Sequence, residues 1–353
     1  VTGSSGGHIF PALAALQALE EKGPALETLL VLPKKNILNV QELSGRAVNF
    51  ISVTAFNFAL KKKNIKGLVN FFRGFFESVA ILCRFKPDVL VGFGSVSCLP
   101  LVFLGWLARK RIILHEQNVI PGRATQMMVI CADKICLSFQ ESLAYFPQCP
   151  GRLVVTGNPL RKKLKSCDKT VARQHFGLTA DRFTLLVMGG SQGSRRINAE
   201  FARFISQLND PLALQVIHLA GKNDCAELER AYRQVGIDFR VFSFLEDMQY
   251  AYSACDLALC RAGATTVAEI AHFGVAAIFI PYPFAYEHQL KNAEALSQRK
   301  AAIIIKEENL SVQELKNQIL ALRDNPARLQ KMRFALEGCF PQQAVERLTR
   351  VIL

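Results

Sequence analysis

The fold is decided by an apolar strand that runs straight into a glycine-rich turn, FTLLVMGGSQGS at residues 183–194. A second turn of this kind, TGSSGGH at residues 2–8, lies near the start of the chain. Glycine lets backbone N–H groups and the positive end of a helix dipole approach an anionic ligand. Because the two turns lie about half a chain apart, the sequence predicts an α/β protein with two doubly wound, Rossmann-like domains facing a cleft.

Short apolar strand candidates alternate with helical segments along the chain, which is typical of parallel sheets. In the first half we expect strands at residues 29–32, 48–53, 89–91, 112–114, 134–137 and 153–155. In the second half we expect them at residues 183–188, 214–219, 239–242, 257–260, 277–280 and 301–305. The turn GNP at 157–159 predicts a domain junction. We therefore expect domains at 1–156 and 157–337, with a helical tail at 338–353 that packs back on the first domain.

Composition limits the class of protein. A chain of 353 residues with 50% hydrophobic and 20% charged residues predicts a folded protein of two domains. The longest apolar stretch, residues 98–108, is shorter than the roughly 20 residues that a spanning helix needs. We expect a few residues of a strand that precedes the first turn to be missing. No signal-peptide pattern opens the chain, and we therefore expect a cytoplasmic protein. Ten cysteines without a Cys-x-x-Cys pair predict buried free thiols and no metal site.

The net charge of +14 predicts an anionic partner. Between Phe56 and Phe85, seven phenylalanines are interleaved with basic residues, namely Lys61, Lys62, Lys63, Lys66, Arg73 and Arg84. One interpretation is a packed helix with a solvated basic edge, since Phe72, Phe76 and residues 79–82 recur at helical spacing and would be core. The other is a peripheral membrane patch for an anionic membrane surface, joined by Trp106 and the basic residues 109–111. Nucleic-acid binding is disfavoured because no recognised motif accompanies the charge.

Two helix entries in the second half carry polar residues suited to a nucleotide sugar. After the strand at 257–260, the segment RAGATTVAE predicts a helix whose Glu269 can accept hydrogen bonds from the vicinal hydroxyls of a ribose, although a capped helix with an acidic residue gives the same pattern. Further on, Gln289 and Asn292 lie one helical turn apart. Their amides can bind sugar hydroxyls, as can any polar helix face.

In the first half, candidate residues follow the glycine turn and a buried strand. His8 begins a helix and is a candidate general base or a capping residue. The segment HEQN at 115–118 follows the strand at 112–114, where ligands bind in open α/β sheets. Arg161 follows the turn at 157–159 and can pair with a diphosphate.

Taken in order, the motifs GGH at 6–8, HEQN at 115–118, GNPLR at 157–161, GGSQG at 189–193 and RAGATTVAE at 261–269 resemble those of a known family. It is the MurG type of bacterial glycosyltransferase, and the resemblance covers essentially the whole chain. The resemblance implies a GT-B fold and inverting transfer of N-acetylglucosamine in peptidoglycan synthesis. The donor would be UDP-N-acetylglucosamine, the acceptor the 4-hydroxyl of undecaprenyl-diphosphate-linked muramoyl-pentapeptide, and the place the cytoplasmic face of the bacterial membrane.

The resemblance also implies roles for single residues. The donor site falls on Arg161 and Ser191 for the diphosphate, Leu245, Ala264, Thr265 and Thr266 for uracil, Glu269 for the ribose, and Gln289 and Asn292 for the sugar. The acceptor side falls on Asn118 and on residues 2–8, including Ser5, Gly6 and Gly7. Departures from the family pattern occur at Ser4, Val96, Thr125 and His288.

We expect a transferase that needs no cofactor and no metal, because no Asp-x-Asp pair occurs in the chain. His8 is the preferred general base and Glu116 the alternative. Three other functions stay open. A UDP-N-acetylglucosamine 2-epimerase shares the fold and donor site, and a lipid-binding scaffold would need neither His8 nor Glu116. An NAD-dependent oxidoreductase suits the first turn, but Lys34 and Lys35 stand where a ribose-binding acid is expected.

Overall fold

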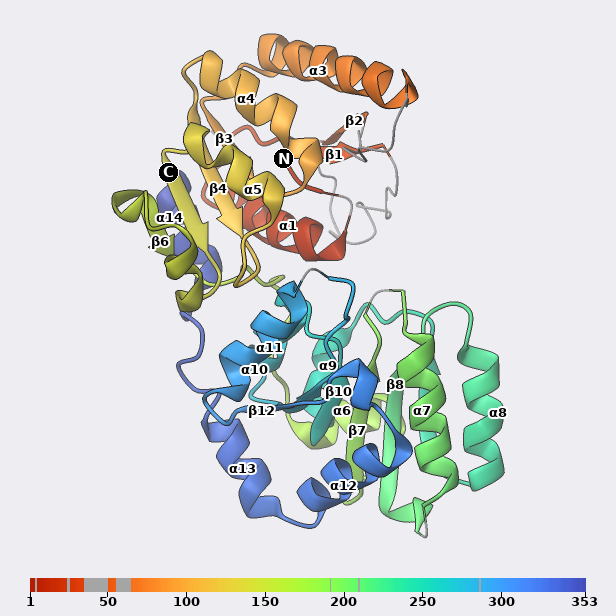
Figure 1. Ribbon diagram of the computed structural model, residues 1–353. Helices are drawn as coiled ribbons and strands as arrows, with labels where there is room; N and C mark the ends of the chain where they lie inside the picture. Colours follow the sequence, from red (N-terminus) through yellow and green to blue (C-terminus); the bar gives the residue numbers. More distant parts are fainter. Residues whose placement is uncertain are drawn as a thin grey trace. The chain divides into compact units, whose positions relative to one another are not determined.

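The computed structural model describes residues 1–3, 5–23, 26–34, 50–54, 65–190, 192–208, 210–285 and 287–353. The chain forms two compact units, one of Val1–Arg161 with Pro341–Leu353 and one of Lys162–Phe340 (Figure 1). Each unit contains parallel strands and helices of its own. The helical end of the chain therefore belongs to the first unit.

The first unit is built on parallel strands whose order changes direction at the start of the chain. Strands β3 (Val89–Gly92), β4 (Arg111–Glu116), β5 (Lys134–Leu137) and β6 (Leu153–Val155) form one sheet in that order, and β1 (Leu30–Pro33) pairs with β2 (Phe50–Val53). Phe93 N donates to Val1 O over 2.9 Å, and Thr2 N donates to Val31 O over 3.1 Å. The first glycine turn thus leaves from between β1 and β3, at the switch point of the strand order.

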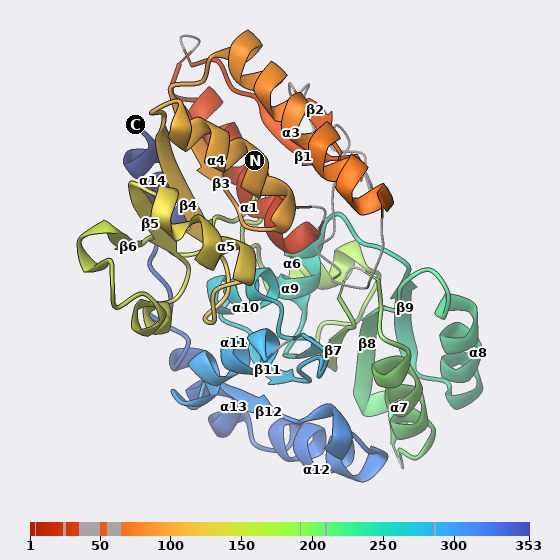
Figure 2. The ribbon, with the colours of Figure 1, turned by 45° about the horizontal axis from the view of Figure 1, so that its top comes forward.

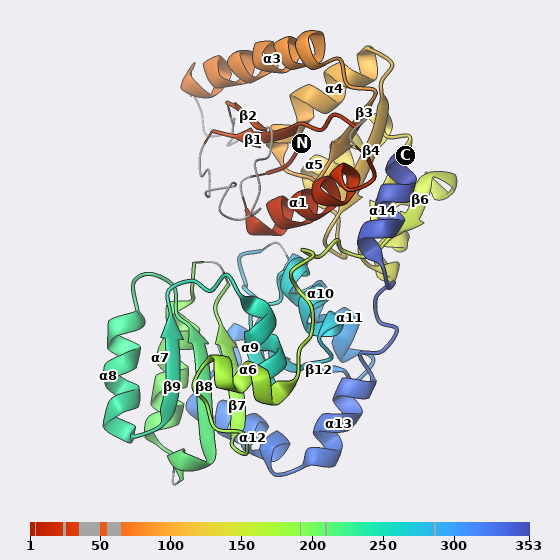
Figure 3. The same ribbon diagram turned by 180° about the vertical axis from the view of Figure 1, so that it is seen from behind.

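Helices cover both faces of this arrangement. On one face lie α1 (Gly6–Glu20) and α14 (Ala344–Ile352), which Figure 3 shows in front. On the other lie α3 (Ile65–Phe85), α4 (Leu99–Leu107) and α5 (Arg123–Met128), and Figure 2 shows α3 running along α4. Leu348 and Ile352 of α14 join the apolar core formed by α1. Arg111 donates to the backbone oxygens of Val351 and Ile352 over 2.8 and 3.0 Å, which fixes the tail to the sheet.

The second unit has one six-stranded parallel sheet with the order β12-β11-β10-β7-β8-β9. Its strands are β7 (Phe183–Met188), β8 (Leu214–Leu219), β9 (Asp238–Phe242), β10 (Leu257–Cys260), β11 (Ala276–Phe279) and β12 (Ala302–Ile304). The chain runs outward from β7 on one side and from β10 on the other, so the switch point lies between these two strands. The second glycine turn follows β7 directly, at the carboxyl edge where ligands bind in such sheets.

Helices pack on both faces of the second sheet because its strands are apolar on both sides. In Figure 1, α7 (Arg195–Ser206) and α12 (Val312–Arg323) lie in front of the sheet, whereas α6 (Lys169–His175) and α9 (Met248–Ala254) lie in front in Figure 3. The remaining helices are α8 (Cys225–Val235), α10 (Ala264–His272), α11 (His288–Ser297) and α13 (Pro326–Phe334). Apolar side chains of α7, α8, α12 and α13 form one core with Leu185, Val187 and Ile278, which are completely buried.

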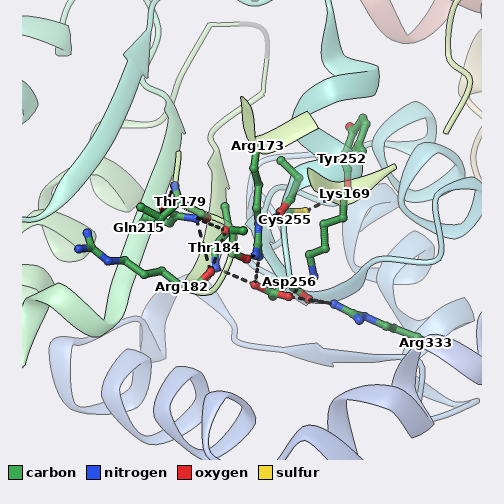
Figure 4. A network of polar contacts seen from close by, with 12 residues as sticks. Lys169, Arg173, Thr179, Arg182, Thr184, Gln215, Tyr252, Cys255, Asp256 and Arg333 are labelled. Atoms are coloured by element: carbon green, nitrogen blue, oxygen red, sulfur yellow. Dashed lines mark hydrogen bonds and ion pairs between the residues drawn. The ribbon is translucent and has the colours of Figure 1, made fainter. Parts of the chain in front are cut away.

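An ion network closes the amino edge of the second sheet (Figure 4). Asp256, at the start of β10, accepts hydrogen bonds from Arg173 Nη2 and from Thr184 N, each over 2.7 Å. Lys169 and Arg333 also pair with this carboxylate. Because a carboxylate that is largely removed from water is stable only when it is paired, this edge is structural.

The strand predictions are confirmed, since every observed strand overlaps an expected one. The prediction that Phe72 and Phe76 belong to the core is wrong, because these rings are 51% and 67% exposed. Ile81, from the predicted stretch 79–82, is buried in helix α3 as expected. The prediction of buried thiols fails at Cys83, which is exposed.

Part of the predicted membrane segment lies outside the described residues, namely Phe56, Phe58, Lys61, Lys62 and Lys63. Across the described ranges, no helix is both long enough and apolar enough to cross a membrane.

Candidate functional site

The first glycine turn presents a histidine ring. Ser5 Oγ lies 2.7 Å from His8 Nδ1. Gly94 has a φ of +77°, and a Cβ added there would lie 3.3 Å from His8 Nε2, so the ring rests against this bare backbone. When Nδ1–H donates to Ser5, the lone pair is on Nε2, which is the arrangement that a general base requires.

Gly6 and Gly7 form the start of α1. A Cβ on Gly6 would lie 3.0 Å from the Phe10 ring, whereas a Cβ on Gly7 would lie no closer than 3.9 Å to its nearest neighbour, Ser5 Oγ. The first N–H groups of a helix have no partner within the helix. The turn therefore offers backbone donors next to the His8 ring.

Glu116, the alternative base, holds the loop that follows β4. Its side chain is 2% exposed. Oε1 accepts hydrogen bonds from Asn118 N over 3.0 Å and Asn118 Nδ2 over 3.2 Å, and Oε2 accepts one from Gly122 N over 3.0 Å. Glu116 thereby fixes the predicted acceptor residue Asn118. The neighbouring His115 is also internal, since its Nε2 lies 3.1 Å from Gly157 O and burial lowers its pKa to about 4.

Arg161 is buried with much of its hydrogen-bonding capacity unused. Its guanidinium lies 4.5 Å from the centre of the Phe10 ring. Within the described part of the chain, its Nε and Nη1 atoms have no hydrogen-bond partner, and neither have the two amide atoms of Asn158. Buried polar groups without partners are rare and costly, so these atoms mark a place that suits a polar ligand or a bound water. Asn158 belongs to the motif GNPLR, but its sequence pattern alone predicts no role for it.

The second glycine turn is held by close backbone packing. Ser191 lies outside the described residues. A Cβ on Gly189 would lie 2.2 Å from Ser194 N, and one on Gly193 would lie 2.1 Å from Ala220 O. Both positions therefore require glycine, as does the φ of +76° at Gly193.

Arg261 links the second turn to the loops that follow β10 and β11. The residue begins the motif RAGATTVAE, but this role was not predicted from the sequence. Arg261 Nη2 donates to Ser194 Oγ over 2.9 Å, and Nη1 donates to Ile280 O over 3.1 Å. The guanidinium also pairs with Glu307 and lies 5.3 Å from the Tyr282 ring centre. Arg261 follows β10 and Ser194 follows β7, so this contact spans the switch point of the sheet.

Helix α10 carries the residues predicted to bind uridine. Ala264, Thr265 and Thr266 form its first turn. The Thr265 hydroxyl is buried without a hydrogen-bond partner in the described part of the chain. Glu269, one turn further, is 7% exposed, and its Oε2 accepts a hydrogen bond from Tyr252 O–H over 2.7 Å.

Gln289 and Asn292, predicted to bind the sugar, contact the loops that follow β10 and β11. Gln289 Oε1 accepts hydrogen bonds from Ala262 N over 3.2 Å and from Tyr282 N over 2.9 Å. Asn292 is fully buried, and its Nδ2 donates to Ala262 O over 3.2 Å. Leu245 is half-buried in the loop after β9. The structure thus brings the described second-unit candidates to one edge of the sheet, after β9, β10 and β11.

Two family models match the chain. Residues 1–137 match the glycosyltransferase family 28 N-terminal domain, and residues 184–348 match the glycosyltransferase family 28 C-terminal domain. Together they cover most of both units.

Curated relatives match over nearly the full length. The enzyme of Geobacter metallireducens is 35% identical over 339 residues, which is 95% of this chain and 92% of that protein. The enzyme of Desulfotalea psychrophila is 34% identical over 356 residues, which is 99% of this chain and 94% of that protein. Each is named UDP-N-acetylglucosamine–N-acetylmuramyl-(pentapeptide) pyrophosphoryl-undecaprenol N-acetylglucosamine transferase.

Solved structures agree in fold. MurG of Acinetobacter baumannii has a TM-score of 0.77 and 26% identity, covering 99% of this chain and 97% of that one. The UDP-N-acetylglucosamine 2-epimerase of Neisseria meningitidis has a TM-score of 0.68, but at 10% identity, with 99% and 96% covered, it shows the fold alone. The chain therefore belongs to glycosyltransferase family 28, among its MurG-type members with the GT-B fold.

Proposed function

We propose that this chain transfers N-acetylglucosamine from UDP-N-acetylglucosamine to an undecaprenyl-diphosphate-linked muramyl-pentapeptide, the reaction that its relatives' names describe. The observation that carries the proposal is the edge of the second sheet. There a glycine turn of the kind that can bind anions and a helix entry with a buried carboxylate follow adjacent strands, β7 and β10, as a nucleoside diphosphate requires.

The reaction would be a single displacement that inverts the anomeric carbon. The acceptor hydroxyl attacks that carbon, its proton passes to a base, and UDP leaves with the bonding electron pair. His8 suits the base through Nε2, because both oxygens of Glu116 already accept hydrogen bonds from its own loop. Arg161 and the N–H groups of the second glycine turn would stabilise charge on the departing diphosphate.

This charge stabilisation would not require a metal ion. The proposal rests on the absence of an Asp-x-Asp pair from the sequence and on the buried, incompletely paired Arg161 guanidinium. Activity should therefore survive chelation with EDTA. Loss of activity that returns with magnesium would contradict this part of the mechanism.

The first unit would dock on an anionic membrane at the cytoplasmic face, through exposed rings on α3 and α4. Phe72, Phe76, Phe103 and Trp106 are 51%, 67%, 47% and 41% exposed on these two packed helices. Exposed Arg73 lies beside the first two rings in sequence. Inserted rings would provide apolar affinity, and cations would add about 1 kcal/mol each near anionic lipid.

Vesicle sedimentation tests this docking face. Vesicles rich in phosphatidylglycerol should bind the wild-type protein less as salt rises, and Phe72→Ser with Phe76→Ser should weaken binding at every salt concentration. Phe334→Ser, which removes a ring that is 72% exposed in the second unit, is the matched control and should bind as wild type does. Equal loss in the control would contradict the assignment.

The activity itself is tested with labelled UDP-N-acetylglucosamine, incubated with and without the lipid-linked acceptor. A transferase labels the lipid and releases UDP only when the acceptor is present. Conversion of the sugar without acceptor would indicate an epimerase, and no turnover in either mixture would indicate a binding protein.

A further inference from the structure

The carboxylate proposed to bind ribose rests on a hydroxyl from the neighbouring helix. Tyr252 O–H donates to Glu269 Oε2 over 2.7 Å, and the two side chains are buried to within 2% and 7% exposure. We propose that Tyr252 is a positioning residue, which holds the Glu269 carboxylate in the orientation that accepts hydrogen bonds from the ribose hydroxyls of a uridine nucleotide. This inference rests on the proposed function, in which Glu269 binds that ribose.

Tyr252 contacts α10 and the residue that follows it, at two points one turn apart. Its ring stacks on Phe273, with ring centres 5.1 Å apart and an angle of 27° between the planes. Its hydroxyl reaches Glu269, four residues before Phe273. A glutamate side chain has several rotatable bonds, and ordering it costs free energy when a ligand binds. Because Tyr252 orders the carboxylate beforehand, that cost falls on folding and not on binding.

Helix α9, which carries Tyr252, is itself anchored. Arg173 Nε donates to Ala254 O over 3.1 Å at the end of α9, and Arg173 Nη2 donates to Asp256. Figure 4 shows Tyr252 and Arg173 around this network. The ion network around Asp256 therefore fixes the end of α9, the helix whose Tyr252 hydroxyl contacts Glu269.

The hydrogen bond has a fixed direction. Burial, and next the adjacent Glu269 carboxylate, raise the pKa of Tyr252 well above its ordinary value, so the hydroxyl keeps its proton and donates. A carboxylate oxygen has two lone-pair sites, so the hydrogen bond from Tyr252 does not by itself prevent Oε2 from accepting a second one. The buried Thr265 hydroxyl, four residues before Glu269 on the same helix face, lacks a partner in the described part of the chain and independently indicates a polar ligand here.

The test compares the affinities of UDP and 2′,3′-dideoxy-UDP, which lacks both ribose hydroxyls, by isothermal titration calorimetry. The wild-type protein should prefer UDP, and Glu269→Ala should remove this preference. Tyr252→Phe should reduce the preference about three- to tenfold while changing the affinity for the dideoxy nucleotide little. In the Glu269→Ala background, Tyr252→Phe should have no further effect on the preference.

The matched control is Tyr232→Phe. Tyr232 is likewise a buried tyrosine on a helix of this unit, and its hydroxyl lies 2.6 Å from His218 Nδ1, so a general effect of losing a buried hydroxyl appears there too. The control should keep the wild-type preference. Thermal melting verifies that each variant is folded; Tyr252→Phe keeps the ring that stacks on Phe273 and removes only the hydroxyl.

Three results would overturn the inference. If folded Tyr252→Phe keeps the wild-type preference for UDP while Glu269→Ala loses it, the role of Tyr252 is refuted and the ribose assignment of Glu269 stands. An equal loss of affinity for both nucleotides shows that Tyr252 only supports the fold. An intact preference in Glu269→Ala refutes the ribose assignment of the proposed function, and the role of Tyr252 with it.

Discussion

The two glycine turns occupy the same place in their sheets but differ in chemistry. Each lies at the switch point of its strand order and begins a helix; the second turn follows β7, and the first follows backbone that hydrogen-bonds to Val31 and Phe93. The first presents His8, held by Ser5, whereas the described residues of the second contain no titratable side chain and pack backbone to backbone against Ala220. A strand-turn-helix element thus fixes where a ligand approaches, and the side chains that follow decide between proton transfer and anion binding.

The largest expected effect breaks the first turn. His8→Ala should lower kcat about 10²- to 10⁴-fold, as expected for loss of a general base, while the Kd of UDP stays unchanged. Steady-state kinetics and calorimetry measure the two quantities, and Ser5→Ala should have the same direction with a smaller effect. A nearly silent His8→Ala beside an inactive Glu116→Gln would reverse the two roles.

Substitution of Arg161, the buried cation of the first unit, tests whether charge on the leaving group is stabilised by the second turn without help from Arg161. Arg161→Ala should lower kcat/KM roughly a hundredfold, within the range seen when one stabiliser of transition-state charge is lost. Arg350→Ala, at an exposed position of α14, is the control and should leave kcat/KM unchanged. Wild-type kinetics in Arg161→Ala would assign the charge to the second turn only.

A matched pair of substitutions sharpens the comparison of the turns. In Gly193→Ala the new Cβ would lie 2.1 Å from Ala220 O at a φ of +76°, so the free energy of unfolding should fall by about 1–3 kcal/mol. In Gly7→Ala the nearest neighbour would be 3.9 Å away and the residue is helical, so the stability should be unchanged or higher. Urea denaturation measures both, and equal destabilisation would contradict the different packing of the turns.

Acid should lower the free energy of unfolding of both units, because each contains a buried histidine with a lowered pKa. Burial lowers the pKa of His115 to about 4 and that of His218 to about 3. Between these values and the unfolded value near 6.5, the unfolded chain binds more protons than the folded one, so stability falls as the pH falls. Each histidine should contribute about 1.4 kcal/mol per pH unit below 6.5, measured by urea denaturation at several pH values. His218→Gln should reduce this slope, and a flat wild-type profile from pH 6.5 to 5 would contradict the prediction.

Local pattern was enough to predict the strands, because runs of apolar residues between turns bury themselves wherever a parallel sheet forms. It failed at Phe72 and Phe76, because helical spacing identifies a stripe but not whether that stripe faces the core or the solvent. The candidate site was predicted where motifs follow strand ends, as at Glu269. The contact of Tyr252 with Glu269 was missed, because it joins two helices whose relative packing no local pattern encodes.

Helix α14 has a consequence for how the protein is made. Leu348 and Ile352 belong to the core of the first unit, although the whole second unit lies between them and the rest of that core in sequence. During synthesis the first unit therefore leaves the ribosome with an open apolar groove along α1, and it closes only after α14 has been translated. Until then the nascent chain exposes an apolar surface to which chaperones or other chains can bind. The second unit, whose residues all precede α14, is able to complete its core before the first unit does.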